Sequence, residues 1–197
     1  MAQTPTKEGE LLSSHMNYLH IVLISELISP NKNEHAVSKT VFEHVSNLHS
    51  LLSKWIQLHG QGCKLCNSIS ALKLHEYHEG YYPEGLDKYT TALVDIMEGM
   101  ITISESTMVI HYYLSLAYGS TVPICTWSLK QFSDTVAQIH EQLVKEVKLK
   151  KVVTENMAHY RNENLMEVFV SSWEFNVYFE IPFTAYLFAE VGLNALK

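Results

Sequence analysis

Two cysteines and two histidines lie close together in the sequence and could bind a metal ion. Cys63-x2-Cys66 is a common half-site for zinc, and His75-x2-His78 follows it. The interval between Cys66 and His75 is shorter than the twelve or so residues usual between such pairs, and its apolar residues are typical of a helix core. We therefore favour a structural role for both cysteines. A zinc-binding helical protein that uses Cys63, Cys66, His75 and His78 is the alternative.

Other residues with catalytic potential lack the partners that their chemistry needs. None of the 11 histidines follows a glutamate by three residues, as the Glu-x-x-His motif of a di-iron bundle requires. The sequence contains no complete dinucleotide loop, no phosphate loop and no serine nucleophile elbow. Cys125 could act as a nucleophile, but nothing in the sequence pairs it with a histidine. The sequence therefore predicts a protein that is not an enzyme and has no cofactor.

Composition narrows the class of protein further. The chain has 197 residues, of which 47% are apolar and 18% charged, so it can form a packed core. Its net charge of −7 disfavours nucleic-acid binding as the main activity. Its 3 cysteines suit a reducing compartment. The longest apolar run, 18–28, is shorter than the roughly 20 residues of a membrane span. We expect a soluble intracellular protein.

Apolar residues recur at alternating steps of three and four along most of the chain, which predicts an all-α fold. A helix is expected over 40–59, and Gly60 and Gly62 are expected to separate it from another over 63–75. The stripe of the first of these helices consists of Val41, Val45, Leu48, Leu52 and Trp55.

The strongest periodic pattern lies between residues 86 and 117. It extends over four heptads and predicts a long helix with a coiled-coil-like seam. The seam consists of Leu86, Tyr89, Leu93, Ile96, Met100, Ile103, Thr107, Ile110, Leu114 and Ala117.

A further helix is expected from the capping box of Ser128 and Gln131 to about His159. Its stripe consists of Leu129, Phe132, Val136, Ile139 and Leu143, after which the pattern drifts. The segment from Glu163 onward predicts two short helices separated near Pro182.

These elements predict an elongated antiparallel helical bundle with coiled-coil-like long helices. We expect residues 39–197 to form a single helical-bundle domain. Residues 1–38 are expected to be a variable N-terminal segment that is partly disordered.

Two clusters could belong to an interaction surface. The first, Lys145, Lys148, Lys150 and Lys151, is either a docking patch for an acidic partner or RNA, or a solvated helix face, which we favour. The second is a group of aromatic residues near the C-terminus, most of which should be core; that one or two of them anchor a partner is the alternative. This group consists of Trp173, Phe175, Tyr178, Phe179, Phe183, Tyr186 and Phe188.

Three stretches of the chain resemble the cyclin-dependent kinase 2-interacting protein family. They are residues 51–73, the heptad helix over 86–119, and residues 125–173. The last stretch is the most specific, because a Cys-Thr-Trp entry at 125–127 precedes a lysine-rich helix and a second tryptophan, Trp173. The order and approximate spacing of these blocks match over roughly residues 45 to 196.

The resemblance implies a non-enzymatic helical adaptor. Such a protein links cyclin-dependent kinase with its cyclin, and the replication-initiation kinase, to DNA replication and to checkpoint signalling after DNA damage. It is also a subunit, beside a second small helical subunit, of an AAA-type ATPase complex that acts on replisome components and on maturing large ribosomal subunits. The implied location is the nucleus, with the cytoplasm as a second one. The resemblance implies no direct binding to nucleic acid or to membranes. We expect the partner-binding surface to include Trp127, Phe132, Lys150, Lys151, Trp173 and Phe179.

Overall fold

The computed structural model describes residues 34–75, 83–116 and 126–196 of the chain. These residues form helices and contain no strand, which confirms the predicted all-α fold. The helices are α2 (Glu34–His75), α3 (Leu86–Leu116), α4 (Leu129–Met157), α5 (Glu163–Glu174), the 3₁₀ turn η1 (Ile181–Phe183) and α6 (Thr184–Glu190). None of the described helices is both long and apolar enough to cross a membrane.

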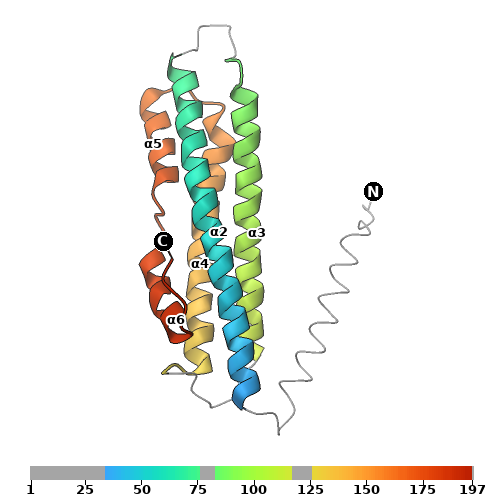
Figure 1. Cartoon of the computed structure of the whole chain (residues 1–197). Helices are drawn as coiled ribbons and strands as arrows, with labels where there is room; N and C mark the ends of the chain where they lie inside the picture. The colour runs from blue at the N-terminus through green and yellow to red at the C-terminus, as the bar shows by residue number, and fades with distance from the viewer. Residues whose placement is uncertain (1–33, 76–82, 117–125, 197) are drawn as a thin grey trace, which may run out of the picture.

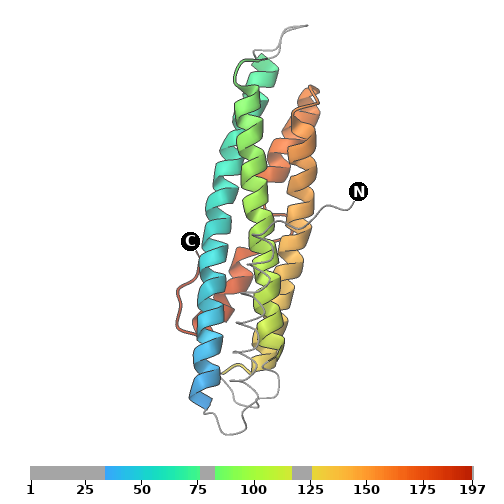
Figure 2. The same cartoon turned by 90° about the vertical axis from the view of Figure 1, so that its right-hand side faces the viewer.

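The three long helices run side by side and alternate in direction (Figures 1 and 2). α3 packs against both α2 and α4, whereas α5 and α6 contact α2 and α4 on the side away from α3. The shorter helices lie one after the other along the bundle and together occupy the place of a fourth helix (Figure 1). We call residues 163–190, which include both helices and the linker between them, the C-terminal column.

The predicted apolar stripes form the core of this bundle. Every member of the α2 and α4 stripes is buried. In α3 the seam from Leu93 to Leu114 is buried, as is Leu86, while Tyr89 is half-buried and Ala117 lies outside the described residues. Burying each large apolar side chain contributes about 1.5–3 kcal/mol, so these stripes supply the main driving force for bundling.

The predicted break at Gly60 and Gly62 is wrong, because α2 continues through both glycines. Gly60 has no neighbour within 4 Å of the position that a Cβ would take, whereas at Gly62 that position is 2.2 Å from Nε1 of Trp173. The second glycine therefore allows the indole of α5 to approach the backbone of α2. Gly62, which the sequence suggested as part of a helix break, is instead a site of close packing between two helices.

The expected capping box at the start of α4 is confirmed. The Ser128 amide donates to Oε1 of Gln131 at 2.7 Å, and the Gln131 amide donates to Oγ of Ser128 at 3.3 Å. At the other end, the buried Lys73 donates from Nζ to the carbonyl of Met157 at 3.1 Å and to that of Ala158. Carbonyls at the end of a helix have no hydrogen-bond donor within that helix, so Lys73 supplies the missing donor at the C-terminal end of α4.

The C-terminal segment contains two short helices, as predicted, although their separation is wider than Pro182 alone indicates. α5 ends at Glu174, and η1 begins only at Ile181. The backbone is extended at both ends of the intervening linker, at Phe175 and at Glu180. This linker, residues 175–180, runs along α4, which contacts it through Lys150, Glu146 and Gln142.

Candidate protein-binding surface

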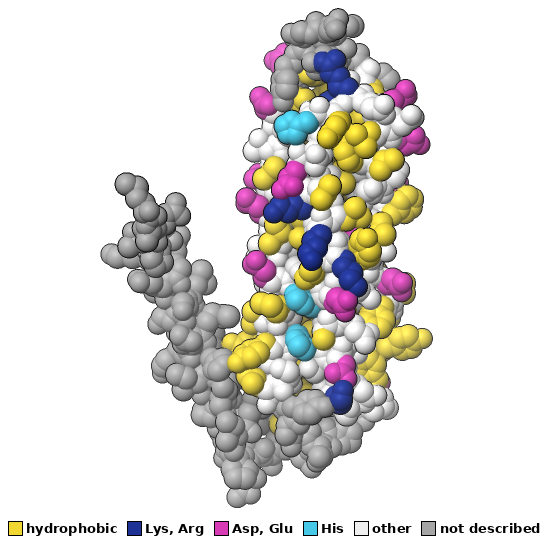
Figure 3. Space-filling model, turned by 180° about the vertical axis from the view of Figure 1, so that it is seen from behind, with side chains coloured by type: hydrophobic (Ala, Val, Ile, Leu, Met, Phe, Trp, Pro, Cys, Tyr) yellow, Lys and Arg dark blue, Asp and Glu magenta, His cyan; other side chains and the backbone are white. Residues whose placement is uncertain are grey.

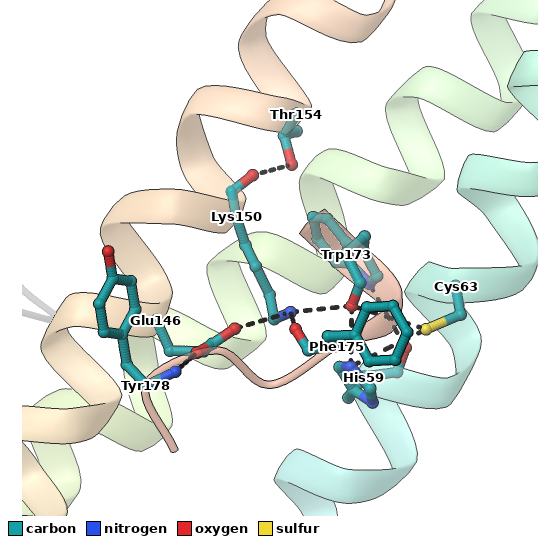
Figure 4. Close-up of polar contacts among 8 residues, drawn as sticks. All are labelled: His59, Cys63, Glu146, Lys150, Thr154, Trp173, Phe175 and Tyr178. Atoms are coloured by element: carbon teal, nitrogen blue, oxygen red, sulfur yellow. Dashed lines mark hydrogen bonds and ion pairs between the residues drawn. The ribbon is translucent and has the colours of Figure 1, made fainter. Parts of the chain in front are cut away.

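A buried ion pair on α4 lies beneath the linker of the C-terminal column (Figure 4). Nζ of Lys150 is 2.9 Å from Oε1 of Glu146, and both side chains are 0% exposed. Removing two charges from water is costly unless each keeps its hydrogen-bond partners. The surrounding contacts supply those partners.

The ammonium group of Lys150 has one ion-pair partner and two hydrogen-bond acceptors. Besides Glu146, it donates to the carbonyl of Trp173 at 2.9 Å and to that of Phe175 at 3.4 Å. Nζ also lies 5.4 Å from the centroid of the Trp173 ring. Because the last carbonyls of α5 lack partners within the helix and carry its negative dipole end, a cation is favourable there. Lys150 thus caps the C-terminal end of α5.

Glu146 and its neighbour Gln142 hold the backbone that follows. Oε2 of Glu146 accepts a 2.8 Å hydrogen bond from the amide of Tyr178, and Oε1 of Gln142 accepts one of 3.3 Å from the amide of Glu180. Side chains of α4 therefore fix the linker at both of its ends. Its side chains are presented on a backbone that α4 holds in place.

His59 and Cys63 of α2 complete the cluster around the same carbonyl. Nε2 of His59 donates to the carbonyl of Trp173 at 2.8 Å, and Sγ of Cys63 is 3.8 Å from that oxygen. Burial, followed by the charge of Lys150, lowers the pKa of His59, while burial raises the pKa of Cys63. Because Nε2 of His59 is engaged by the carbonyl and 3.9 Å from Sγ, this pair lacks the geometry of a cysteine nucleophile with its base.

The alternative zinc site receives no support from the described residues. Cys66 is buried in the hydrophobic core, and burial raises the pKa of its thiol to about 12. The side chain of His75 and all of His78 lie outside what the structure describes. Within the described ranges, no three His, Cys, Asp or Glu residues are grouped so that they could hold a metal ion. Cys125 also lies outside these ranges.

Most of the residues expected on the partner-binding surface are in the core instead. Trp127 is half-buried against Phe132, with ring centroids 5.4 Å apart, and Lys151 is exposed and 3.8 Å from Glu155. The expectation of surface positions is wrong for the four buried residues, which are Phe132, Lys150, Trp173 and Phe179. Three of them are large rings that fill the bundle, and Lys150 is buried because the contacts above satisfy its charge.

The lysine cluster of α4 is mainly a solvated helix face. Lys145 and Lys151 are exposed and pair with glutamates one turn away on the same helix, and Lys148 is exposed. This agrees with the interpretation that the sequence favoured. Lys150 is the exception, since it faces the core.

The C-terminal aromatic cluster divides into buried and exposed members. Trp173, Phe179 and Phe188 are buried, and Phe183 is half-buried. Phe175 and Tyr186 are 62% and 76% exposed, and they are accompanied by three further exposed residues. We define the outer apolar surface as Val168, Phe175, Val177, Tyr178 and Tyr186. Exposed rings and aliphatic side chains on one element are typical of an interaction site.

The charge of the C-terminal column distinguishes it from the rest of the bundle. Between residues 162 and 196 the chain contains no Lys or Arg, and its charged residues are Glu163, Glu167, Glu174, Glu180 and Glu190. Seen from behind, hydrophobic and acidic side chains occupy the edge where α5 and α6 lie, whereas basic side chains gather nearer the middle (Figure 3). The outer apolar surface is therefore bordered by negative charge.

A sequence signal for the buried pair was present but pointed to the wrong interpretation. The α4 stripe was expected to drift after Leu143. In the structure it continues instead at steps of three and four, through Glu146 and Lys150 to Val153 and Met157. Charged residues of opposite sign at stripe positions, one turn apart, indicate a buried ion pair. Their partners come from main-chain atoms far along the sequence and leave no sequence pattern.

Comparison of the chain with models of known protein families finds no match, and comparison with curated proteins finds none either.

Proposed function

We propose that this protein is a non-enzymatic helical adaptor that binds other proteins through the outer apolar surface of its C-terminal column. The observation that carries this proposal is the contrast between Phe175 and Tyr178 and the backbone beneath them. Both side chains are exposed, while the Phe175 carbonyl and the Tyr178 amide are held by Lys150 and Glu146. Aromatic side chains on a preorganised backbone bind partners with a small loss of conformational entropy.

The resemblance to the cyclin-dependent kinase 2-interacting protein family suggests which partners these are. We propose a role that connects cyclin-dependent kinase and the replication-initiation kinase to DNA replication and checkpoint signalling in the nucleus. The second proposed setting is an AAA-type ATPase complex that acts on replisome components and on the maturing large ribosomal subunit. In both settings the partners perform the phosphorylation or ATP hydrolysis, and the adaptor brings them together.

Quantitative co-purification from cells tests this function. We expect the tagged full chain to recover AAA-type ATPase subunits or cell-cycle kinases, and the double variant Phe175→Ser and Tyr186→Ser to recover much less of them. The matched control is Val94→Ser with Met108→Ser, because these apolar residues are 45% and 50% exposed and belong to α3, which packs against α2 and α4 and not against α5 or α6. Recovery of neither class of partner by the unmodified chain would refute the adaptor assignment.

A further inference from the structure

Acidic and apolar residues repeat together along the exposed side of α5 and at its C-terminal cap, Phe175. Glu167 and Val168 are both exposed, and so are Glu174 and Phe175, seven residues further on. Seven residues are about two helical turns, or roughly 10 Å, so the two pairs lie on the same side of the helix. The surface thus presents an apolar side chain beside a carboxylate twice, at heptad spacing.

The carboxylates of this repeat are available to a partner. Glu167, Glu174 and Glu180 are exposed, and the ion pairs found among the described residues are all on α2 or α4. Of the lysines in the second half of α4, Lys145 and Lys151 pair with glutamates of that helix, Lys150 belongs to the buried cluster, and Lys148 is exposed. A partner that brings positive charge to this side would therefore meet uncompensated negative charge.

The geometry points to a basic amphipathic helix of a partner protein as the occupant of this surface. Apolar residues seven apart on such a helix pack against Val168 and Phe175, and flanking Lys or Arg residues lie opposite Glu167 and Glu174. Helices that bind one another make contact through apolar residues at such spacings, and the flanking charges determine their orientation and choice of partner. This inference rests on the proposed function, because it names the chemistry of the partner that the same surface binds.

The linker carries the apolar surface beyond the end of α5. Lys150 binds the carbonyls of Trp173 and Phe175 at the end of α5, and the chain leaves the helix after Glu174 with Phe175 extended. Val177 and Tyr178 continue the apolar surface beyond the end of α5, and Tyr186 extends it onto α6. The exposed side of the column is in this way longer than α5 alone.

Binding of a synthetic peptide to the full chain tests the inference. The probe is a fluorescent three-heptad peptide with leucine at the first and fourth heptad positions and lysine at the flanking positions. Its matched partner has glutamate in place of every lysine. Fluorescence anisotropy is expected to show binding of the lysine peptide that weakens with added salt, and no binding of the glutamate peptide.

Paired variants locate the site of binding. The double variant Val168→Ser with Phe175→Ser is expected to lower the affinity for the lysine peptide about tenfold or more, as is typical of central interface anchors. The double variant Glu167→Gln with Glu174→Gln is expected to weaken the binding of the lysine peptide and to reduce the salt dependence of that binding. The control Glu98→Gln with Glu105→Gln removes the same charge from exposed positions of α3 and is expected to change little. All three double variants lie at exposed positions, and circular dichroism checks that they fold.

Three results would overturn the inference. They are no binding of the lysine peptide, equal binding of the glutamate peptide, and equal weakening by the α3 control, which would indicate attraction to net charge alone. If any of these occurs while co-purification still depends on Phe175 and Tyr186, the adaptor function stands and only the partner chemistry is wrong. If the peptide binds as expected but no protein partner is recovered, the proposed function fails instead.

Discussion

Lys150 donates a 2.9 Å hydrogen bond to the carbonyl of Trp173, and this contact joins the core of α4 to the end of α5. The indole of Trp173 in turn occupies the space that a side chain at position 62 of α2 would fill. One residue of the C-terminal column is thereby fixed by two long helices. The exposed Phe175 follows directly, so the buried contacts determine how the outer apolar surface is presented.

Removal of the buried cation should destabilise the protein strongly. Lys150→Met leaves the carboxylate of Glu146 buried without its cation and leaves the carbonyl of Trp173 without this donor, which should cost about 3–5 kcal/mol. Urea unfolding measures this change. In the control, Lys151→Met removes an exposed lysine whose ion pair contributes little, and it should have a much smaller effect. Equal effects of the two substitutions would contradict the role assigned to the buried pair.

The two glycines of α2 should respond to alanine in opposite directions. Gly60→Ala meets no atom and should raise the free energy of unfolding by about 1 kcal/mol, because alanine is the better helix former. Gly62→Ala brings a methyl group against the ring of Trp173 and should lower the free energy of unfolding. Thermal and urea unfolding of both variants provide the measurement. Stabilisation by both would show that α5 does not approach α2 as described.

Mild acid should weaken the fold through partly buried histidines. Burial lowers the pKa of His44, His59 and His140 below the ordinary value of 6.5. The unfolded chain then binds more protons than the folded chain between the two pKa values, so the free energy of unfolding falls as the pH drops through this window. Unfolding measured between pH 7.5 and about 5.5 should show this decrease.

One histidine allows the origin of this pH dependence to be tested. The ring of His44 stacks on Tyr113 with centroids 5.4 Å apart and an angle of 9° between the planes. His44→Phe keeps a ring at that place but removes its proton, and it should reduce the slope of stability against pH below about 6.5. An unchanged slope would exclude His44 as a contributor.

The thiol of Cys66 should react only when the protein unfolds. It is buried and its pKa is raised to about 12, so almost none is thiolate at neutral pH. Alkylation with iodoacetamide, followed by mass spectrometry, should modify Cys66 in urea but not in buffer. Rapid labelling of Cys66 in the native protein would contradict this burial.

The sequence predicted the parts of the fold that depend on local periodicity. The stripes of α2, α3 and α4 and the capping box at Ser128 follow from residues within one helix, and the structure confirms them. Features that depend on contacts between distant segments were predicted wrongly. Gly62 looked like a break because its neighbour Trp173 lies more than a hundred residues away, and Lys150 looked exposed because its acceptors are main-chain carbonyls of α5.

The candidate surface was only partly predictable for the same reason. Most of the seven aromatic residues near the C-terminus were expected in the core, but only Trp173, Phe179 and Phe188 are buried. The sequence could not show which ones, because the exposure of Phe175 and Tyr186 depends on where α5 ends and how α6 packs. Phe179 was expected on the surface, but its ring lies 5.9 Å from that of Trp55 in the core.

Hydroxyl-radical footprinting of the complex purified from cells tests the central claim most directly. Oxidation of each side chain is compared between the free chain and the chain bound to its partners. The account predicts that Phe175, Tyr178 and Tyr186 become protected on binding, while Met108 on α3 stays as reactive as in the free chain. Protection of Met108 with unchanged oxidation of the three aromatic residues would place the partner on another face and contradict the account.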